Sequence, residues 1–167
     1  MNIVLTGFMA SGKSTIGKEI ANISELKFID TDEMIIQETG MTVNEIFEIS
    51  GEKGFRELEN ELVKKIADWD GYVIATGGGL PTNRENIRIL RHNGIIINLA
   101  PDFEVVKSRI LCDSERLSRP LLKNTDLEKT EKLFNERIQY YRDCDFQMRV
   151  TNDKKPEYYA KEILSYL

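Results

Sequence analysis

The chain has 167 residues, of which 41% are hydrophobic and 31% are charged, a balance typical of a globular protein with one hydrophobic core. No apolar run approaches the length that spans a membrane. The net charge of −5 argues against a general nucleic-acid binder, because binding to phosphate backbones needs clustered Lys and Arg. We therefore expect neither a membrane nor a nucleic acid as a partner.

The N-terminal sequence and the two cysteines indicate the cellular compartment. The first predicted strand follows Met1 directly, which leaves no room for a cleavable leader, and the two cysteines fit neither a disulfide framework nor a zinc site. We therefore expect a cytoplasmic protein. We also expect a monomer. Because no linker or repeat interrupts the sequence, residues 1–167 are expected to form a single domain.

Strand and helix patterns alternate along the chain. Runs rich in β-branched and aromatic residues predict strands at Asn2 to Thr6, Lys27 to Thr31, Tyr72 to Thr76, Ile95 to Leu99 and Phe146 to Thr151. Amphipathic spacing predicts helices at Lys13 to Ile23, Gly54 to Trp69, Thr82 to His92, Phe103 to Leu111, Leu127 to Arg142 and Pro156 to Tyr166. Several strands are continuously apolar, as in a parallel sheet covered on both faces, so the pattern indicates an α/β fold.

Two polar stretches interrupt this alternation. The first, from Asp32 to Ile49, has a mostly helical pattern and is expected to be an insertion. The second, from Cys112 to Asn124, has no periodicity and is long for a plain connection, so we expect a mobile lid there.

A complete phosphate-binding motif, G-x-x-x-x-G-K-[ST], occupies Gly7 to Ser14, between the first predicted strand and the first predicted helix. Its glycines let backbone N–H groups turn toward an anion, and the helix that follows adds the positive end of its dipole. Lys13 is expected to reach the β- and γ-phosphates, and Ser14 to supply a hydroxyl for Mg²⁺. The motif predicts a bound nucleoside triphosphate and leaves the phosphate acceptor open.

Two carboxylates, Asp30 and Asp32, lie at the end of the second predicted strand, where ligand-binding groups collect in α/β sheets. At strand spacing they are expected to project to the same side. They would repel each other unless a cation or a hydroxyl-bearing ligand lies between them, which suits Mg²⁺ and a substrate alcohol. The alternative is a solvated turn that caps the next helix.

Three consecutive glycines, Gly77, Gly78 and Gly79, follow the third predicted strand. They permit close approach of the backbone to a ligand, and their N–H groups can meet an anion or a polar substrate. The alternative, a tight strand-to-helix connection, explains one glycine better than three.

Two arginines stand out as possible anion ligands. Arg137 lies within the apolar stripe of its predicted helix, so its guanidinium either binds an anion or runs along the edge of the stripe to solvent. Arg56 either forms an exposed helix pair with Glu59, or is held by Glu59 so that its planar fork can bind a carboxylate.

The expected lid carries Arg116 and Arg119 beside Pro120 and Leu121. In phosphoryl transfer, a closing arginine can offset charge on the moving phosphoryl group while apolar neighbours exclude water. The alternative is an ordinary solvated loop.

Taken in chain order, these motifs resemble those of the shikimate kinase family of P-loop small-molecule kinases. The resemblance implies a three-layer α/β/α fold with five parallel strands in the order 2-3-1-4-5. It also implies transfer of the γ-phosphoryl group of ATP to the 3-hydroxyl of shikimate, with Mg²⁺, in aromatic amino-acid biosynthesis. The matching segments are Gly7 to Thr15, Phe28 to Asp32, Ile46 to Glu59, the glycine triplet, Ser118 to Leu122 and Arg137 to Tyr141.

The same resemblance implies the roles of individual residues. The catalytic residues would be Lys13, Asp32 and Arg119, with Asp32 orienting or deprotonating the hydroxyl and Arg119 closing onto the phosphate in transit. ATP would be bound by Gly7, Ala10, Ser11, Gly12, Lys13, Ser14, Thr15, Arg109, Arg119 and Asn152. Shikimate would be bound by Asp32, Phe47, Phe55, Arg56, Glu59, Gly77, Gly78, Gly79, Pro120, Leu121 and Arg137. Mg²⁺ would be held by Ser14 and Asp30.

Other functions stay open at this stage. A pair of arginines binds a phosphate as well as a carboxylate, so the acceptor could instead be gluconate or a nucleoside monophosphate. The chain could also be a nucleotide-dependent regulatory module, or a structural protein that binds ATP without turning it over.

Overall fold

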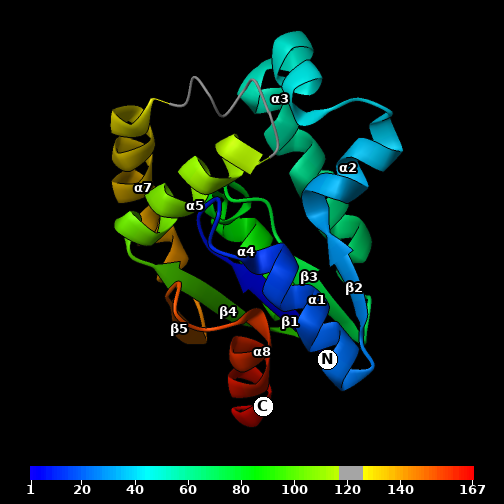
Figure 1. Cartoon of the computed structure of the whole chain (residues 1–167). Helices are drawn as coiled ribbons and strands as arrows, with labels where there is room; N and C mark the ends of the chain where they lie inside the picture. The colour runs from blue at the N-terminus through cyan, green and yellow to red at the C-terminus, as the bar shows by residue number, and fades with distance from the viewer. Residues whose placement is uncertain (117–125) are drawn as a thin grey trace.

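The computed structural model describes residues 1–116 and 126–167, apart from the side chains of residues 113–116. Five parallel strands form one sheet, in the order β2-β3-β1-β4-β5, as Figure 1 shows. Their bounds are β1 (Asn2–Thr6), β2 (Lys27–Asp30), β3 (Tyr72–Ala75), β4 (Gly94–Pro101) and β5 (Phe146–Val150). The expected α/β fold and strand order are confirmed.

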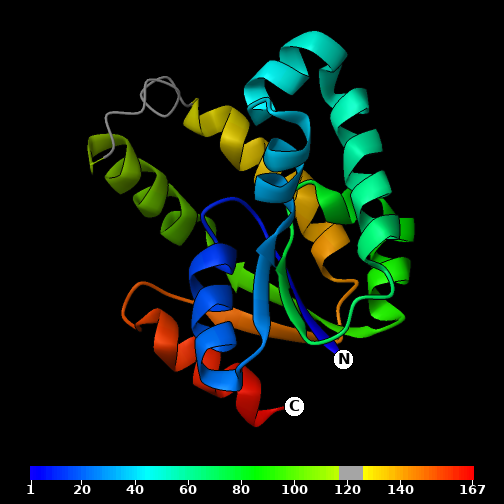
Figure 2. The same ribbon diagram turned by 90° about the vertical axis from the view of Figure 1, so that its right-hand side faces the viewer.

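Helices cover both faces of the sheet. Figure 2 shows α1 (Lys13–Ser24) and α8 (Pro156–Ser165) on one face, and α3 (Val43–Ile66) and α4 (Arg84–Arg91) on the other. The remaining helices are α2 (Thr31–Thr39), the short 3-10 turn η1 (Leu80–Thr82), α5 (Phe103–Arg116) and α7 (Leu127–Tyr141). In the described part of the chain, no helix has the length and apolar character needed to cross a membrane.

The central strand β1 is buried along its whole length, which explains its continuous apolar sequence. Ile3 and Leu5 pack in a core with α1 and α8, whereas Val4, between them, packs in a second core with α3 and α4. Alternate residues of a strand point to opposite faces, so β1 contributes to both cores.

The register of the strands brings three segments to one edge of the sheet. Ala75 of β3 pairs with Leu5 of β1 and with Asp30 of β2. The phosphate-binding loop, Asp30 and the glycine triplet therefore all begin where these strands end, the edge at which α/β sheets bind ligands.

The second strand ends one residue earlier than expected, because Asp30 is the N-cap of α2. Its Oδ1 accepts hydrogen bonds from the backbone N–H groups of Asp32, at 3.0 Å, and Glu33, at 3.4 Å. Asp30 and Asp32 are therefore not alternate residues of one strand, and the prediction that strand spacing projects them together is wrong. Asp32 lies in the first turn of α2 instead.

The helix expected at Gly54 begins eleven residues earlier, at Val43. Thr42 and Glu45 form a capping box at its start, with Thr42 N–H donating to Glu45 Oε2 at 2.7 Å. Gly51 then interrupts the helix with a φ of 68°, a left-handed angle that glycine adopts readily. This kink separates the first segment of the helix, most of which was expected as part of an insertion, from the longer amphipathic segment that follows.

Helix α5 continues to Arg116, beyond the expected end at Leu111. The first residues of the expected lid, 112–116, are therefore helical, and the prediction of an irregular segment there is wrong. The other residues of that segment, 117–124, lie outside the described residues.

Replacement of Ile74 by Ala should lower the free energy of unfolding by about 2–5 kcal/mol, because the side chain lies fully buried in β3 and its loss leaves a cavity. Ile49→Ala is the matched control, since Ile49 is 72% exposed, and it should change stability by less than about 0.5 kcal/mol. Urea denaturation of the two variants measures both effects. Equal losses would contradict this placement of β3.

Candidate active site

The phosphate-binding motif forms a tight loop between β1 and α1. A Cβ atom on Gly7 would lie 2.6 Å from the carbonyl oxygen of Leu99, so the close approach to β4 requires glycine. Gly12 has a φ of 99° and is the N-cap of α1, where it offers no side chain to the first N–H groups of the helix. Those groups are thus available to an anion, and they lie at the positive end of the helix dipole.

The ammonium group of Lys13 lies inside this loop. Its Nζ donates to the carbonyl oxygens of Gly7 and Phe8, both at 2.8 Å, and to Ser11 Oγ at 3.4 Å. Burial lowers the pKa of Lys13 to about 8, against the opposing influence of Asp32 and Asp30. A bound polyphosphate would favour the charged form further, so the loop is suited to an anionic ligand.

Ser14 and Asp30 form a pair of oxygen ligands suited to Mg²⁺. The Oγ of Ser14 donates to Asp30 Oδ2 at 2.6 Å. Mg²⁺ is commonly held by one or two protein oxygens together with phosphate oxygens and water. The described part of the chain contains no cluster of three or more His, Cys, Asp or Glu side chains that could hold a metal ion.

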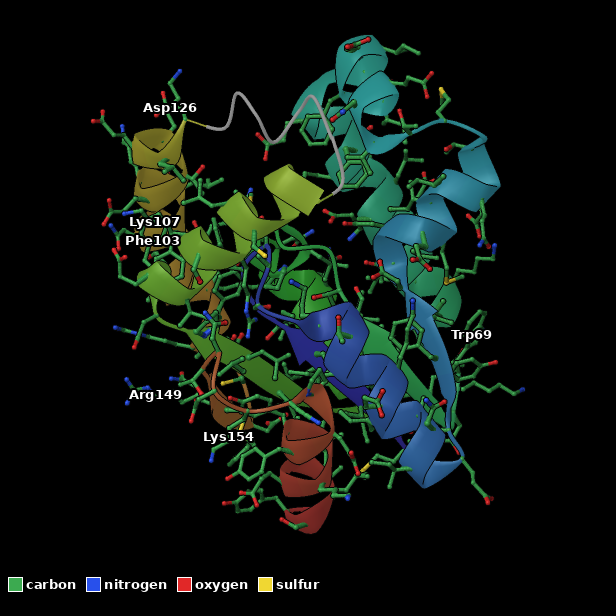
Figure 3. All side chains as sticks on the ribbon, in the orientation of Figure 1. Trp69, Phe103, Lys107, Asp126, Arg149 and Lys154 are labelled. Carbon is green, nitrogen blue, oxygen red and sulfur yellow. The ribbon has the colours of Figure 1, made fainter. Side chains whose placement is uncertain are left out.

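A pocket of about 360 Å³ opens beside the phosphate-binding loop. Arg109 of α5 spans it, donating from one nitrogen to the carbonyl oxygen of Ala10 and from another to Asn152 Oδ1, both at 2.9 Å. Lys154 lies in the same β5–α8 loop as Asn152, at the place labelled in Figure 3. The pocket is lined by Ala10, Gly12, Thr15, Ile16, Arg109, Cys112, Lys154, Pro156 and Tyr159.

This pocket has the size and position for a nucleotide base. Ile16 and Tyr159 line it although the sequence did not predict them as site residues, because their apolar helical spacing is what any packed helix shows. Their role in a pocket depends on α1 and α8 lying side by side, as they do here.

Two buried carboxylates face each other across Gly77. Asp32 Oδ1 and Glu59 Oε1 are buried and have no hydrogen-bond partner in the described part of the chain. A Cβ atom on Gly77 would collide with Asp32 Oδ1 and would lie 2.9 Å from Glu59 Oε1, so glycine makes room for both. Two unpartnered buried acceptors call for a ligand with hydrogen-bond donors, such as hydroxyl groups.

The pKa values of both carboxylates are raised. For Asp32 the cause is burial and then the charge of Asp30, against Lys13 and Arg56. For Glu59 burial raises the pKa to about 7, although the ion pair with Arg56 opposes this. Asp32 is therefore a better proton acceptor than an exposed aspartate.

Arg56 is held in place by two glutamates. One guanidinium nitrogen donates to Glu59 Oε2 at 2.6 Å and another to Glu52 Oε1 at 3.1 Å. Because the Glu59 side chain is 0% exposed, the Arg56–Glu59 pair is not an ordinary surface pair. The guanidinium also lies against Gly79, where a Cβ atom would collide with it.

The contact of Glu52 with Arg56 was not predicted, although a spacing of four residues on one helix is a usable signal.

The two phenylalanines predicted to bind the substrate, Phe47 and Phe55, have different surroundings. Phe55 is 3% exposed and belongs to the core, whereas Phe47 is 37% exposed, and their ring centroids are 5.1 Å apart.

Arg137 of α7 is directed toward the glycine triplet. One of its guanidinium nitrogens would be 3.8 Å from a Cβ atom on Gly78. Tyr141, one turn further along α7, donates to the carbonyl oxygen of Gly78 at 2.6 Å and so ties the helix to the triplet. Of the two alternatives for Arg137, this geometry favours an inward guanidinium.

The predicted lid residues Arg119, Pro120 and Leu121 lie outside the described residues, as does the side chain of Arg116.

Comparisons with known proteins agree with this geometry. The family model for shikimate kinase matches residues 9–167. A shikimate kinase from Caldicellulosiruptor bescii is 46% identical over 165 residues, which cover 98% of this chain and 94% of that protein. The chain belongs to the shikimate kinase family. Members of this family are phosphotransferases that use ATP with Mg²⁺, and this chain is an enzyme of that kind.

Solved structures show the same relationship. Shikimate kinase from Acinetobacter baumannii, solved in complex with shikimate, has a TM-score of 0.87 and 33% identity, with 99% of this chain and 91% of that chain covered. A gluconokinase from Sinorhizobium meliloti has a TM-score of 0.63 and 16% identity, covering 98% of this chain and 89% of its own, and shares the fold alone.

The raised pKa of Glu59 predicts a pH-dependent contribution to stability. Between pH values near 4.5 and 7, folded Glu59 holds a proton that the unfolded chain has lost, so the free energy of unfolding falls as pH rises through this interval. Glu59→Gln removes this pH-dependent contribution to stability. Urea denaturation at several pH values should therefore show that the free energy of unfolding of the wild type declines relative to that of the variant as pH rises. A difference between the two proteins that does not change with pH would contradict a raised pKa for Glu59.

Proposed function

We propose that this chain transfers the γ-phosphoryl group of ATP to the 3-hydroxyl of shikimate, giving shikimate 3-phosphate and ADP for aromatic amino-acid biosynthesis. We further propose that it acts in the cytoplasm, where ATP is available as the phosphoryl donor. The main support is the convergence at one sheet edge of a phosphate-binding loop, two inward arginines and two buried carboxylates with unpartnered oxygens. Shikimate carries hydroxyl groups and a single carboxylate, which complement this set.

The donor half of the site consists of the loop Gly7 to Thr15 with Arg109 and Asn152. The N–H groups of the loop and the ammonium of Lys13 bind the phosphates of ATP and neutralise charge on them. Ser14 and Asp30 would hold Mg²⁺, which would neutralise further charge on the phosphates. Arg109 and the pocket behind it enclose the base.

The acceptor half fixes the ring by its charged and polar groups. Arg56 and Arg137 bind the carboxylate of shikimate, and Glu59 keeps the guanidinium of Arg56 in the required orientation. The triplet Gly77 to Gly79 lets the ring come close to the backbone. Phe47 then bounds its apolar edge, with the ring of Phe55 packed against that of Phe47.

The reaction requires one new bond and one proton transfer. The 3-hydroxyl oxygen bonds to the γ-phosphorus while the bond from that phosphorus to the β–γ bridging oxygen breaks, and ADP leaves with the bridging oxygen. Asp32 orients the hydroxyl and accepts its proton. Arg119 would offset charge on the phosphoryl group in transit, and Pro120 and Leu121 would exclude water; these roles rest on the sequence.

Release of ADP from ATP and Mg²⁺ should depend on shikimate. In a coupled assay we expect turnover to rise at least about tenfold over the rate without acceptor, because the acceptor hydroxyl replaces water as nucleophile. Gluconate and a nucleoside monophosphate are the comparison acceptors. Clear stimulation by either of them without stimulation by shikimate would overturn the proposed acceptor, whereas ATP binding without any turnover would favour the regulatory module.

Asp32→Asn should lower kcat about 100-fold or more, because the amide cannot accept the proton of the hydroxyl. Affinity for ATP, measured by titration with a fluorescent analogue, should change less than twofold. Glu33→Gln is the matched control, since Glu33 is exposed in the same turn of α2, and it should leave both quantities unchanged. Wild-type turnover in Asp32→Asn would remove Asp32 from the catalytic step.

A further inference from the structure

A second cavity, of about 330 Å³, lies next to the kinase site, between α7 and the carboxyl ends of β4 and β5 (Figure 1). Asn98 and Ala100 of β4 form part of its floor, on the face of the sheet to which Ile96 also points. Figure 3 shows Phe103 and Arg149, two other lining residues, on this same side of the molecule. Its volume is within the range of small-molecule sites.

One wall of the cavity is aromatic. Phe8 and Phe134 meet edge to face with ring centroids 5.2 Å apart, and Phe103 lies 5.5 Å from Phe134. All three rings line the cavity. Such a wall favours a flat apolar ring, because aromatic groups gain both buried area and ring-to-ring contacts.

The floor holds an unsatisfied polar group. Asn98 is 5% exposed, and its Oδ1 has no hydrogen-bond partner within residues 1–116 and 126–167. A buried amide oxygen without a hydrogen-bond partner lowers the stability of the fold. A ligand with a polar group at its inner end, or water, would remove this penalty.

The rim carries a net positive charge. Arg149 pairs with Asp102, donating to its Oδ2 at 2.9 Å, whereas Arg142 forms no ion pair with any described residue. The two arginines and one aspartate leave one positive charge beside the opening. A carboxylate is therefore the complementary group for the outer end of a ligand.

We propose that this cavity is a second small-molecule site, which binds a monocyclic aromatic carboxylate with its ring against the phenylalanine wall and its carboxylate at Arg142. The cavity is separate from the kinase site but adjoins it at two points. The carbonyl oxygen of Phe8 accepts from Lys13, and the hydroxyl of Tyr141, which also lines the cavity, donates to Gly78. Apart from Phe8, none of the lining residues belongs to the kinase site, so we expect a ligand to occupy the cavity while ATP and the acceptor are bound.

Calorimetric titration with 3-phenylpropionate tests this site. We expect saturable binding of one molecule per chain, with a dissociation constant on the order of 1 mM, in the absence and in the presence of saturating ADP and shikimate. Arg142→Gln should weaken binding at least fivefold, and Ala100→Leu should do the same by filling the floor. Arg88→Gln is the control, because Arg88 is exposed on α4 and lies outside the cavity.

Four results would overturn the proposal. The first two are the absence of saturable binding of 3-phenylpropionate and its displacement by ADP and shikimate. The other two are equal binding by the wild type and both cavity variants, and equal affinity for acetate, which lacks the ring. Because the readout is binding and not turnover, the test is independent of whether shikimate is the acceptor.

Discussion

The parallel pairing of β3 between β1 and β2 is the constraint on which the kinase site depends. Two hydrogen bonds extend it past the sheet, since both the N–H and the Oγ1 of Thr76 donate to the carbonyl oxygen of Leu5 at 3.0 Å. Gly77 N–H then donates to Thr31 Oγ1 at 2.8 Å. These bonds fix the glycine triplet beside the phosphate-binding loop on one side and α2 on the other, so donor and acceptor halves meet at one edge.

The site gathers charged side chains that are partly or fully buried, which a folded core would normally exclude. Three cations and three anions lie close together, and two carboxylate oxygens are left without partners. Burial lowers the pKa of the lysine and raises those of two of the carboxylates, so each charged form is held at a cost in stability that bound ligands would offset. The six side chains are Lys13, Asp30, Asp32, Arg56, Glu59 and Arg137.

Much of the fold could be predicted from the sequence because the signals are local. Five apolar runs and the helices between them indicated a parallel sheet, and the family resemblance supplied the strand order. The errors in the predicted bounds of β2 and α3 arose where two local sequence signals overlap. Asp30 is the last residue of β2, but its side chain caps α2. The left-handed angle at Gly51 divides α3 into two segments.

The sequence by itself determined the chemistry of the phosphate-binding loop, because all of its groups lie within a few residues and their spacing dictates their geometry. The tertiary structure decided between the alternatives for Arg56 and Arg137. Whether a guanidinium is solvated or directed inward depends on its neighbours, and here these are glycines of a distant segment, Gly79 and Gly78. Such contacts between remote segments arise only when the sheet and its helices pack together.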